Sequence, residues 1–346
     1  FEMIKFSINT HRGCFGGCSF CTISAHQGKF IASRSKESIL KEVDKVANMP
    51  DFKGYLSDIG GPSANMYQMK GKVQEICDKC VAPSCINPVI CSNLDTSHAS
   101  MTDLYKSVDK HPKVKKSFIG SGIRYDMLVS DFNKNADPKE LEEYTEEVIT
   151  NHVSGRLKVA PEHTSDKVLK LMRKPSFSNF HDFKKLFDKI NLRKKLNLQL
   201  IPYFISSHPQ SEIEDMANMA AETKDMGFQL EQVQGFTPTP MTVATVIYYS
   251  GYHPYTLKPT KTPKSKKEKD EQHRFFFWYK KGNKDWIRNT LNKLGRKDLV
   301  EVLVPEKENK SWKSVKPVAV KNTFDDAIPA SHSRRKSKGK SRNKRR

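Results

Sequence analysis

Three cysteines near the start of the chain are spaced so that their sulfur atoms can bind one metal centre. Cys14, Cys18 and Cys21 form the pattern C-x3-C-x2-C in a glycine-rich stretch, HRGCFGGCSFC. Glycines let a loop fold closely enough to point several thiolates at one centre. Three thiolates can bind three irons of a [4Fe–4S] cluster, which ordinarily takes four ligands, so the fourth iron stays open to a non-protein ligand. Zinc sites more often pair C-x2-4-C with a second, distant pair of ligands. The spacing therefore favours an iron–sulfur cluster that can do chemistry.

A second group of four cysteines lies within fifteen residues, in the pattern C-x2-C-x4-C-x5-C: Cys77, Cys80, Cys85 and Cys91. Four thiols in one loop are enough to hold a second [4Fe–4S] cluster or a zinc ion. The spacing does not decide which of the two metals is bound. A second cluster could bind substrate or relay electrons. Two other interpretations stay open, in which Cys77 only ends a helix face and Cys91 is a buried strand residue.

Disulfide bonds are a poorer explanation for these cysteines. Their total of seven is odd, and the spacing within each group is too tight for ordinary pairing. The first residues, FEMIKFSINTHR, carry charges and lack the apolar block of a secretory signal. Without such a signal, metal binding is the better default for clustered cysteines, and we expect a cytoplasmic protein.

Strands and helices alternate along the first 250 residues and must position these cysteines. Apolar stretches predict strands at residues 3–10, 55–61, 114–122, 155–163, 196–206 and 228–236. Six strand–helix units predict an α/β fold with a parallel sheet covered by helices, either doubly wound or a partial barrel. The first cysteine group directly follows the first strand. In a barrel, such a loop opens at the carboxyl-terminal face, where active sites collect.

Capping patterns mark where several helices begin and end. One helix starts at Ser35, and Asp137 followed by proline predicts the N-cap and first turn of another. Ser211 and Glu214 predict a capping box for a helix that stops at Gly227. The inward positions of the first two helices are expected to be Ile39, Leu40, Val43, Val46, Ala47, Leu141, Tyr144, Val148 and Ile149.

Composition divides the chain into a core and three smaller parts. Residues 1–250 form the core, with a cysteine-rich insertion at about 77–98. Residues 251–270 are rich in Pro and Lys and are interpreted as a linker. Residues 271–304 predict a small helical appendage, and residues 305–346, with little apolar periodicity, a disordered basic tail. The apolar residues available to pack the appendage are Phe276, Trp286, Ile287 and Leu291.

The chain carries 60 Lys and Arg against 39 Asp and Glu, a net charge of +21. The last sixteen residues hold nine basic residues and no acidic one, so the remainder carries about +12. We interpret this end as a solubilising arm, and the alternative is a non-specific contact with RNA or the ribosome. No apolar run approaches the roughly 20 residues that span a bilayer, which argues against a membrane protein.

Phe20 completes a more specific pattern, C-x3-C-x-aromatic-C after a strand, which resembles the signature of radical S-adenosylmethionine (SAM) enzymes. Further stretches are similar to the YgiQ-like group of that superfamily: SDIGGPSANMY (57–67), SGIRYD (121–126), KVAPEHTSDKVLKLMRKP (158–175), LIPYFISSHP (200–209) and QVQGFTPTPMTVAT (232–245). The resemblance spans residues 1–250 and continues more weakly through 273–300. It implies a partial (β/α)6 TIM-type barrel of the radical SAM type, whose open side admits large substrates.

The resemblance also implies cofactors and a partner. In radical SAM enzymes the open iron is chelated by the amino and carboxylate groups of SAM. An electron from a donor such as a flavodoxin or ferredoxin cleaves SAM to methionine and a 5′-deoxyadenosyl radical, which takes hydrogen from substrate. The resemblance defines no substrate. YgiQ-like proteins generally carry a further region before the cysteine motif, and this chain begins with Phe1, so we interpret it as a fragment.

By the same resemblance, three residues are expected to contact the adenine and amino group of SAM. Phe20 is the aromatic that would lie beside the adenine. Gly60 and Gly61 resemble the start of the Gly-Gly-Glu motif that holds the SAM amino group, although Pro62 replaces the glutamate. Backbone carbonyls can still accept from the ammonium. A plain turn is the alternative for this glycine pair.

Two charged residues at strand ends complete the expected SAM site. Glu162 would bond the ribose hydroxyls, and Arg124 would pair with the SAM carboxylate through two hydrogen bonds. A surface salt bridge is the alternative for each. No catalytic residue is assigned, and the weaker candidates at strand ends are His163, Ser206 and Gln234.

Two classes of function follow from these residues. The first is a radical SAM enzyme that acts on an undefined substrate. The second is a non-catalytic nucleic-acid-binding protein stabilised by a structural metal, whose affinity would fall steeply with salt. The compact cysteine motif and Phe20 favour the enzyme. A family member that keeps the cluster but has lost turnover is a third hypothesis.

Overall fold

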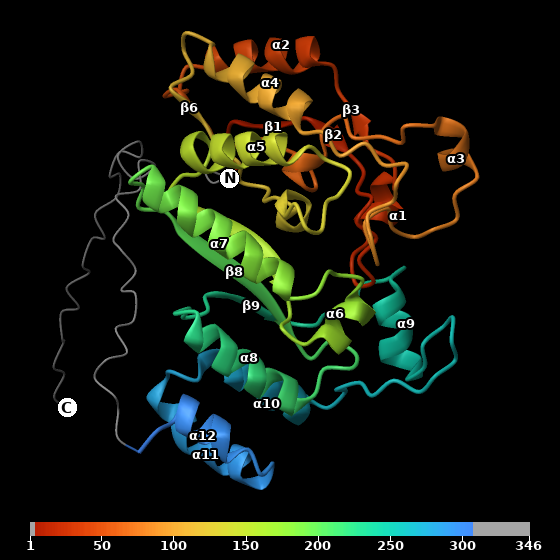
Figure 1. Ribbon diagram of the computed structural model, residues 1–346, viewed down its shortest axis with the longest axis vertical. Coiled ribbons are helices and arrows are strands. Elements are labelled where there is room, and N and C mark those ends of the chain that lie inside the picture. Colours follow the sequence, from red (N-terminus) through yellow and green to blue (C-terminus); the bar gives the residue numbers. More distant parts are fainter. Residues whose placement is uncertain (1–3, 307–346) are drawn as a thin grey trace, which may run out of the picture.

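The computed structural model describes residues 4–306, in which short parallel strands alternate with helices (Figure 1). The basic stretch at 331–346 lies outside the described residues, as does nearly all of the tail predicted at 305–346. Each of the six predicted strands has an observed strand inside its range, because alternating burial is a local property of the sequence. The observed strands are shorter than predicted, and their ends are set by pairing.

Four strands near the N-terminus form two parallel pairs. β1 (Ser7–Asn9) pairs with β5 (Asp58–Gly60), and β4 (Tyr55–Leu56) pairs with β6 (Lys116–Ser117). A backbone hydrogen bond of 2.9 Å from Ile59 N to Phe118 O links the two pairs. β2 (His11–Arg12) and β3 (Ala32–Ser33) form an antiparallel ribbon beside them. This ribbon begins and closes the loop that carries the first cysteine group.

Three longer strands form a second parallel sheet. β7 (Arg156–Glu162), β8 (Gln199–Ser206) and β9 (Gln232–Gly235) lie in this order, with β8 in the middle. The register of β7 against β8 shifts between Val159 and Glu162. Beyond the shift, Glu162 pairs with Phe204 as the last residue of β7.

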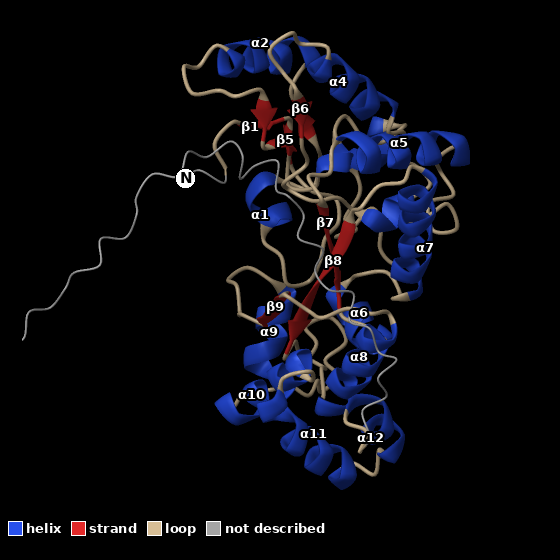
Figure 2. Cartoon of the chain, turned by 90° about the vertical axis from the view of Figure 1, so that its left-hand side faces the viewer, coloured by secondary structure: helices blue, strands red, loops and turns tan. Residues whose placement is uncertain are grey.

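The mixed α/β class is confirmed, whereas the partial barrel is not. Within residues 4–306 the strands form three two-stranded sheets and one three-stranded sheet, without a closed barrel. Figure 2 shows β1, β5 and β6 at one end and β7, β8 and β9 following them diagonally. Sequence periodicity predicts strands, but closure depends on pairing between strands far apart in the chain.

Five longer helices cover the strands: α2 (Lys36–Ala47), α4 (Ala99–Asp109), α5 (Pro138–Asn151), α7 (Ser178–Arg193) and α8 (Ile213–Asp225). α2 begins as predicted, with the Ser35 hydroxyl accepting from Ser38 N at 3.2 Å. α5 is capped by Asp137, which accepts from Lys139 N at 3.0 Å. The predicted inward residues of both helices are buried, except Leu40, which is partly exposed.

The predicted capping box of α8 is wrong by one residue. Glu212 is the N-cap, and Asp215 returns the reciprocal bond, so Ser211 and Glu214 do not form the box. The Ser211 hydroxyl instead donates to Gln272 Oε1 at 2.9 Å, a tertiary contact that no local pattern reveals. The end of the helix is confirmed, since Gly227 follows it with a φ of 79°.

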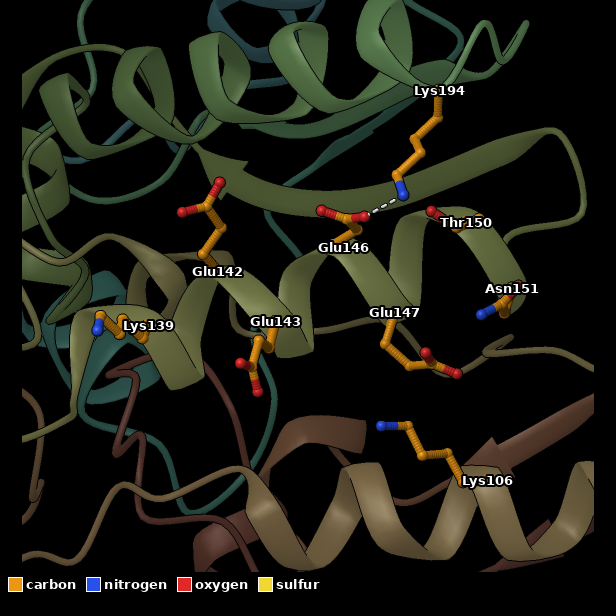
Figure 3. Close-up of a pocket in the computed structure, with 9 residues that line it drawn as sticks. All are labelled: Lys106, Lys139, Glu142, Glu143, Glu146, Glu147, Thr150, Asn151 and Lys194. Carbon is orange, nitrogen blue, oxygen red and sulfur yellow. Dashed lines mark ion pairs between the residues drawn. The ribbon is translucent and has the colours of Figure 1, made fainter.

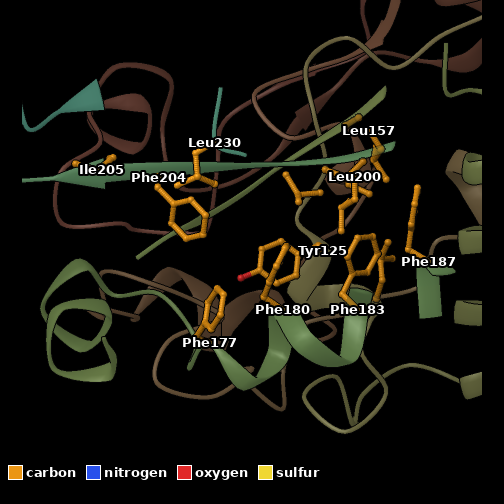
Figure 4. Close-up of a cluster of buried hydrophobic side chains, with 14 of the residues drawn as sticks. Tyr125, Leu157, Phe177, Phe180, Phe183, Phe187, Leu200, Phe204, Ile205 and Leu230 are labelled. Carbon is orange, nitrogen blue, oxygen red and sulfur yellow. The ribbon is translucent and has the colours of Figure 1, made fainter. Parts of the chain in front are cut away.

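An aromatic cluster joins α7 to the second sheet (Figure 4). Phe180, Phe183 and Phe187 on α7 are fully buried, and they pack with Tyr125 and Phe204. The Tyr125 and Phe180 rings meet edge to face at 5.8 Å. Burying each phenyl ring contributes about 1.5–3 kcal/mol. This cluster fixes the sheet edge from which Glu162 projects.

Short helical segments carry the loops between these elements: α1 (Ile23–Gln27), η1 (Ala64–Met66), α3 (Gln74–Asp78), η2 (Tyr125–Leu128) and α6 (Asp166–Met172). α3 stands away from the covering helices, on the same side as α1 (Figure 1). The segment that follows α3 carries most of the second cysteine group.

The C-terminal part of the described chain is helical: α9 (Val243–Ser250), α10 (Lys266–Arg274), η3 (Phe275–Phe277), α11 (Lys281–Lys293) and α12 (Lys297–Leu303). α10 begins inside the stretch interpreted as a linker. Phe276, Ile287 and Leu291 are buried as predicted, and Trp286 is partly buried. α12 packs on α8, and Arg296 pairs with Glu214 at 2.8 Å. None of the described helices is both long and apolar enough to cross a membrane.

Candidate functional site

The first cysteine group lies in one tight loop between β2 and α1. Cys14 N donates to Gly28 O at 3.1 Å, and Cys21 N donates to Cys18 O at 3.2 Å. The Ser24 hydroxyl donates to Cys14 O at 2.8 Å. These bonds hold the three cysteines on a short path, as the sequence predicted for a metal-binding loop.

Two glycines make this path sterically feasible. Gly13 has a φ of 92°, and a Cβ atom there would lie 2.1 Å from Phe30 O. Gly17 has a φ of 61°, and a Cβ atom there would lie 2.2 Å from Pro83 O. Both values are in the left-handed region, where a side chain is strained. The glycines of HRGCFGGC therefore serve the backbone of the loop.

Positive charge and N–H donors face the sulfur atoms. Arg124 Nη1 lies 3.5 Å from Cys18 Sγ, and Gly16 N donates to Cys14 Sγ at 3.4 Å. Burial raises the pKa of Cys14 to about 11; Arg124 opposes this shift, whereas Cys18 and Cys21 add to it. The three thiols are thus within electrostatic reach of one another. Hydrogen bonds from N–H groups and nearby positive charges stabilise thiolates that are bound to a metal.

Arg124 is buried and paired with Asp126. Its Nε donates to Asp126 Oδ1 at 3.0 Å, and its Nη2 donates to Asp126 Oδ2. Burial opposes ionisation of Asp126, but the guanidinium holds the pKa of this carboxyl below its usual value. The pair is an internal one rather than a surface salt bridge. It leaves Nη1 as the atom of Arg124 directed at the cysteine loop, and contact with SAM stays a prediction.

Glu162 ends β7 in a conformation that is unusual for a non-glycine residue. Its φ is 72°, its side chain is buried, and Oε2 has no hydrogen-bond partner among the described residues. Burial raises the pKa of Glu162 to about 7, partly opposed by Lys174 and Arg124. Strained residues with unmet polar atoms concentrate at functional sites. Glu162 also lies within electrostatic reach of Cys21, so it belongs to the same site.

Polar groups at the end of β8 lie next to Phe20. The Phe20 ring meets the His208 ring edge-on at 6.0 Å. Ser206 Oγ, Ser207 Oγ and His208 Nε2 are buried without hydrogen-bond partners in the described part of the chain. The sequence indicates Ser206 as a weaker candidate at a strand end, but it does not indicate Ser207 or His208. Their only signal was a polar run, SSHP, directly after an apolar strand.

Gly60 and Gly61 have a packing role in the structure. A Cβ atom on Gly60 would lie 2.2 Å from Ser121 Oγ, and one on Gly61 would lie 2.6 Å from the His11 ring. Burial lowers the pKa of His11 to about 4, so this imidazole is neutral at neutral pH. Close approach therefore accounts for both glycines, and their predicted contact with SAM is not tested.

The second cysteine group packs directly on the first loop. Cys85 N donates to Phe15 O at 2.9 Å, and the Ser84 hydroxyl donates to Gly16 O at 2.8 Å. The sequence separates these positions by about 70 residues and gives no sign of the contact. The two cysteine groups are therefore neighbours in the fold, although the sequence alone predicts the second group to lie in a separate insertion.

The residues present fit an iron–sulfur cluster at the first loop by their chemistry. Three thiols, a guanidinium and a backbone N–H are the donor set and the compensating groups that such a cluster uses. Across residues 4–306, no three Cys, His, Asp or Glu side chains already stand in an arrangement that could hold a metal ion. A cluster at this loop would therefore require its three thiols to turn toward a common centre.

A separate charged groove of about 480 Å³ lies along α5 (Figure 3). Glu142, Glu146 and Glu147 line it together with Lys106 and Lys194, and Lys194 is paired with Glu146. None of the predicted site residues lines this groove. The carboxylates of this groove face lysines on a solvated side of the helix. Such surface pairing explains why the carboxylates are there, and no bound ligand is needed to explain it.

Comparison with known proteins places this chain among the UPF0313 proteins. It is 62% identical over 303 residues to a UPF0313 protein of Bacteroides thetaiotaomicron, a match that covers 88% of this chain and 49% of the relative. It is 56% identical to a UPF0313 protein of Porphyromonas gingivalis, over 99% of this chain and 52% of the relative. The chain thus spans about half the length of these curated relatives. It belongs to the UPF0313 family, and the resemblance to the YgiQ-like group is confirmed.

Two further likenesses are more limited. A family model described as "Domain of unknown function (DUF3362)" matches residues 231–346. Among solved structures, the radical SAM methyltransferase TsrM from Kitasatospora setae, with cobalamin and a [4Fe–4S] cluster bound, aligns with a TM-score of 0.41 and 12% identity. That alignment covers 70% of this chain and 38% of TsrM. A likeness this distant does not argue for a shared reaction.

Proposed function

We propose that this chain is the core of a radical SAM enzyme that binds a [4Fe–4S] cluster through Cys14, Cys18 and Cys21. The observation that supports this most is the convergence of the cysteine loop with Arg124, from the segment before η2, and Glu162, from the end of β7. When bound, the cluster would supply the electron that cleaves SAM to methionine and a 5′-deoxyadenosyl radical. The substrate of that radical is left open.

The residues around the loop have separate tasks in this proposal. Arg124 places positive charge beside Cys18 and compensates the negative charge of the thiolates. Glu162 holds a carboxyl whose free Oε2 can accept from a hydroxyl such as those of ribose. Phe20 offers an aromatic face at the same end of the sheet, beside His208.

The test is anaerobic reconstitution of the whole chain with iron and sulfide, followed by reduction in the presence of SAM. The proposal expects methionine and 5′-deoxyadenosine as products. A variant with Cys14→Ala, Cys18→Ala and Cys21→Ala should lose this cleavage. A reconstituted protein with a full complement of iron that leaves SAM intact would contradict the proposal.

The same preparation tests the alternative of a non-catalytic nucleic-acid-binding protein. That alternative expects a colourless protein with bound zinc and an affinity for RNA that falls steeply with salt. Removal of residues 331–346, which hold nine Lys and Arg, should then abolish RNA binding. A chain that cleaves SAM and is indifferent to this truncation would exclude it.

A further inference from the structure

The second group of cysteines is gathered by the backbone into two pairs. Cys77 lies in α3, and Cys80 N donates to Cys77 O at 3.0 Å. Cys91 N donates to Cys85 O at 2.8 Å. Cys85 lies within electrostatic reach of the other three thiols. Cys91 is exposed and lies outside the strands, so it is not the buried strand residue of the alternative, whereas Cys77 does lie near the end of a helix. The four thiols belong to one region of the molecule.

A cavity of about 340 Å³ opens beside these cysteines. Three of the cysteines, Cys77, Cys85 and Cys91, line it, and its apolar wall includes Phe15, Ile31, Met69 and Leu94. Cys80 is exposed beside it. A space of this kind suits a cluster of several atoms, whose ligands stand apart, better than a single ion drawn into a closed tetrahedron of sulfurs.

Polar donors already face two of the sulfur atoms. Lys29 Nζ lies 3.2 Å from Cys80 Sγ and also donates to Ala82 O at 2.8 Å, which fixes the ammonium at the site. Asn93 Nδ2 lies 3.3 Å from Cys77 Sγ. A tetrathiolate centre carries net negative charge, and hydrogen bonds and cations at its sulfurs stabilise it. Lys29, which follows α1 in the chain, supplies this positive charge.

The same segment is anchored to the first cysteine loop. The bond from Cys85 N to Phe15 O joins a proposed ligand of the second group to the residue that follows Cys14. Ser84 Oγ donates to Gly16 O, and Gly17 leaves room for Pro83 O. The second group is therefore held on a fixed surface of the core, which a metal centre needs for a defined geometry.

We propose that Cys77, Cys80, Cys85 and Cys91 bind a second iron–sulfur cluster, seated against the loop of the first. The proposal concerns metal binding alone and stands apart from SAM cleavage. Binding turns the four thiols into the cavity between Cys77 and Cys91. The proposal assigns a function to the segment after α3, which belongs neither to the core strands nor to the expected SAM site.

The test counts iron and acid-labile sulfide per chain after anaerobic reconstitution without SAM. The triple variant Cys14→Ala/Cys18→Ala/Cys21→Ala should keep about four irons and four sulfides, on the stoichiometry of a cubane cluster. Adding Cys80→Ala and Cys91→Ala to it should remove them. In the otherwise unchanged chain, the Cys80→Ala/Cys91→Ala variant should lose about half of the iron.

Cys80 and Cys91 are chosen because both are exposed, so their loss should spare the fold. Val81→Ala, at a side chain that is 98% exposed between them, is the matched control and should keep all the iron. The proposal fails if the triple variant binds no iron, or if its iron survives the loss of Cys80 and Cys91. Stoichiometric zinc without sulfide in the triple variant would also overturn it. Because SAM is absent, failure of SAM cleavage leaves this result unaffected.

Discussion

Arg124 Nη1 lies 3.5 Å from Cys18 Sγ, although the two residues are 106 positions apart in the chain. The same guanidinium is held by two hydrogen bonds to the buried carboxylate of Asp126. Arg124 thus links the core to the cysteine loop, and it has a structural partner as well as a proposed functional one. Experiments on this residue must separate the two roles.

The Arg124→Ala substitution should reduce the free energy of unfolding by about 3–5 kcal/mol, because it leaves the charge of Asp126 buried and unpaired. Replacing both partners, as Arg124→Leu/Asp126→Leu, should restore most of this stability without restoring iron retention at the first loop. Urea unfolding and iron content measure the two effects. Arg156→Ala breaks an exposed pair with Glu231 and should cost less than about 1 kcal/mol. Equal losses from Arg124→Ala and Arg156→Ala would refute the structural role.

His98 should make the protein sensitive to mild acid. Burial lowers its pKa to about 3, and it is surrounded by the Tyr144 ring, Asn65 and the Glu140 carboxylate that accepts from its backbone N–H. A histidine whose pKa is lowered in the folded state contributes fully to stability at pH values above its pKa in the unfolded state, about 6.5. This contribution is lost as the pH falls below that value. At pH 5 the loss is about 2 kcal/mol.

The measurement for His98 compares urea unfolding at pH 7.5 and pH 5. The His98→Gln variant should be less stable at pH 7.5, but its stability should fall by about 2 kcal/mol less between the two pH values. The difference between variant and parent isolates His98, because every other titratable group is the same in both. An unchanged pH dependence would show that His98 is not the acid-sensitive group.

Gly17→Ala should disrupt the contact between the two cysteine loops. Its φ of 61° disfavours a side chain by about 1–2 kcal/mol, and the new Cβ would collide with Pro83 O. We expect a destabilisation of at least this size and lower iron retention at both loops. Gly282→Ala on α11 is the control, since a Cβ there meets nothing within 4 Å, and it should be neutral or stabilising by up to about 1 kcal/mol. Similar melting curves for both variants would contradict the close contact.

Gln272 should join the C-terminal helices to the core. Its Oε1 accepts from Ser207 N and Ser211 Oγ, both at 2.9 Å, and its Nε2 donates to Ser211 O at 2.8 Å. Gln272→Ala leaves these buried groups unsatisfied and should cost about 1–3 kcal/mol. Lys267→Ala on the exposed face of the same helix should change stability by less than about 0.5 kcal/mol. Urea unfolding distinguishes them, and no difference would mean that α10 is only loosely attached.

Much of the fold was predictable because it depends on neighbours in the sequence. The burial of Leu141, Tyr144 and Val148 follows from helical periodicity, and Asp137 caps its helix through a bond to a residue two positions later. The capping box of α8 was displaced because Ser211 is taken by Gln272, 61 positions away. The arrangement of the strands could not be predicted, since pairing across the sheet depends on the whole chain.

The sequence by itself determined which residues can do chemistry: two groups of thiols, a loop with the glycines needed to bend it, and Phe20 beside the last thiol. These are local facts of residue type and spacing. Only the tertiary structure decided that Arg124 faces Cys18 and that Cys85 is bonded to Phe15. It also decided that Glu162 is buried with an oxygen that finds no hydrogen-bond partner within residues 4–306. The physical reason is that burial and close contact arise only when distant segments pack together. This packing removes water from polar and charged groups, whose properties then differ from those they have in solvent.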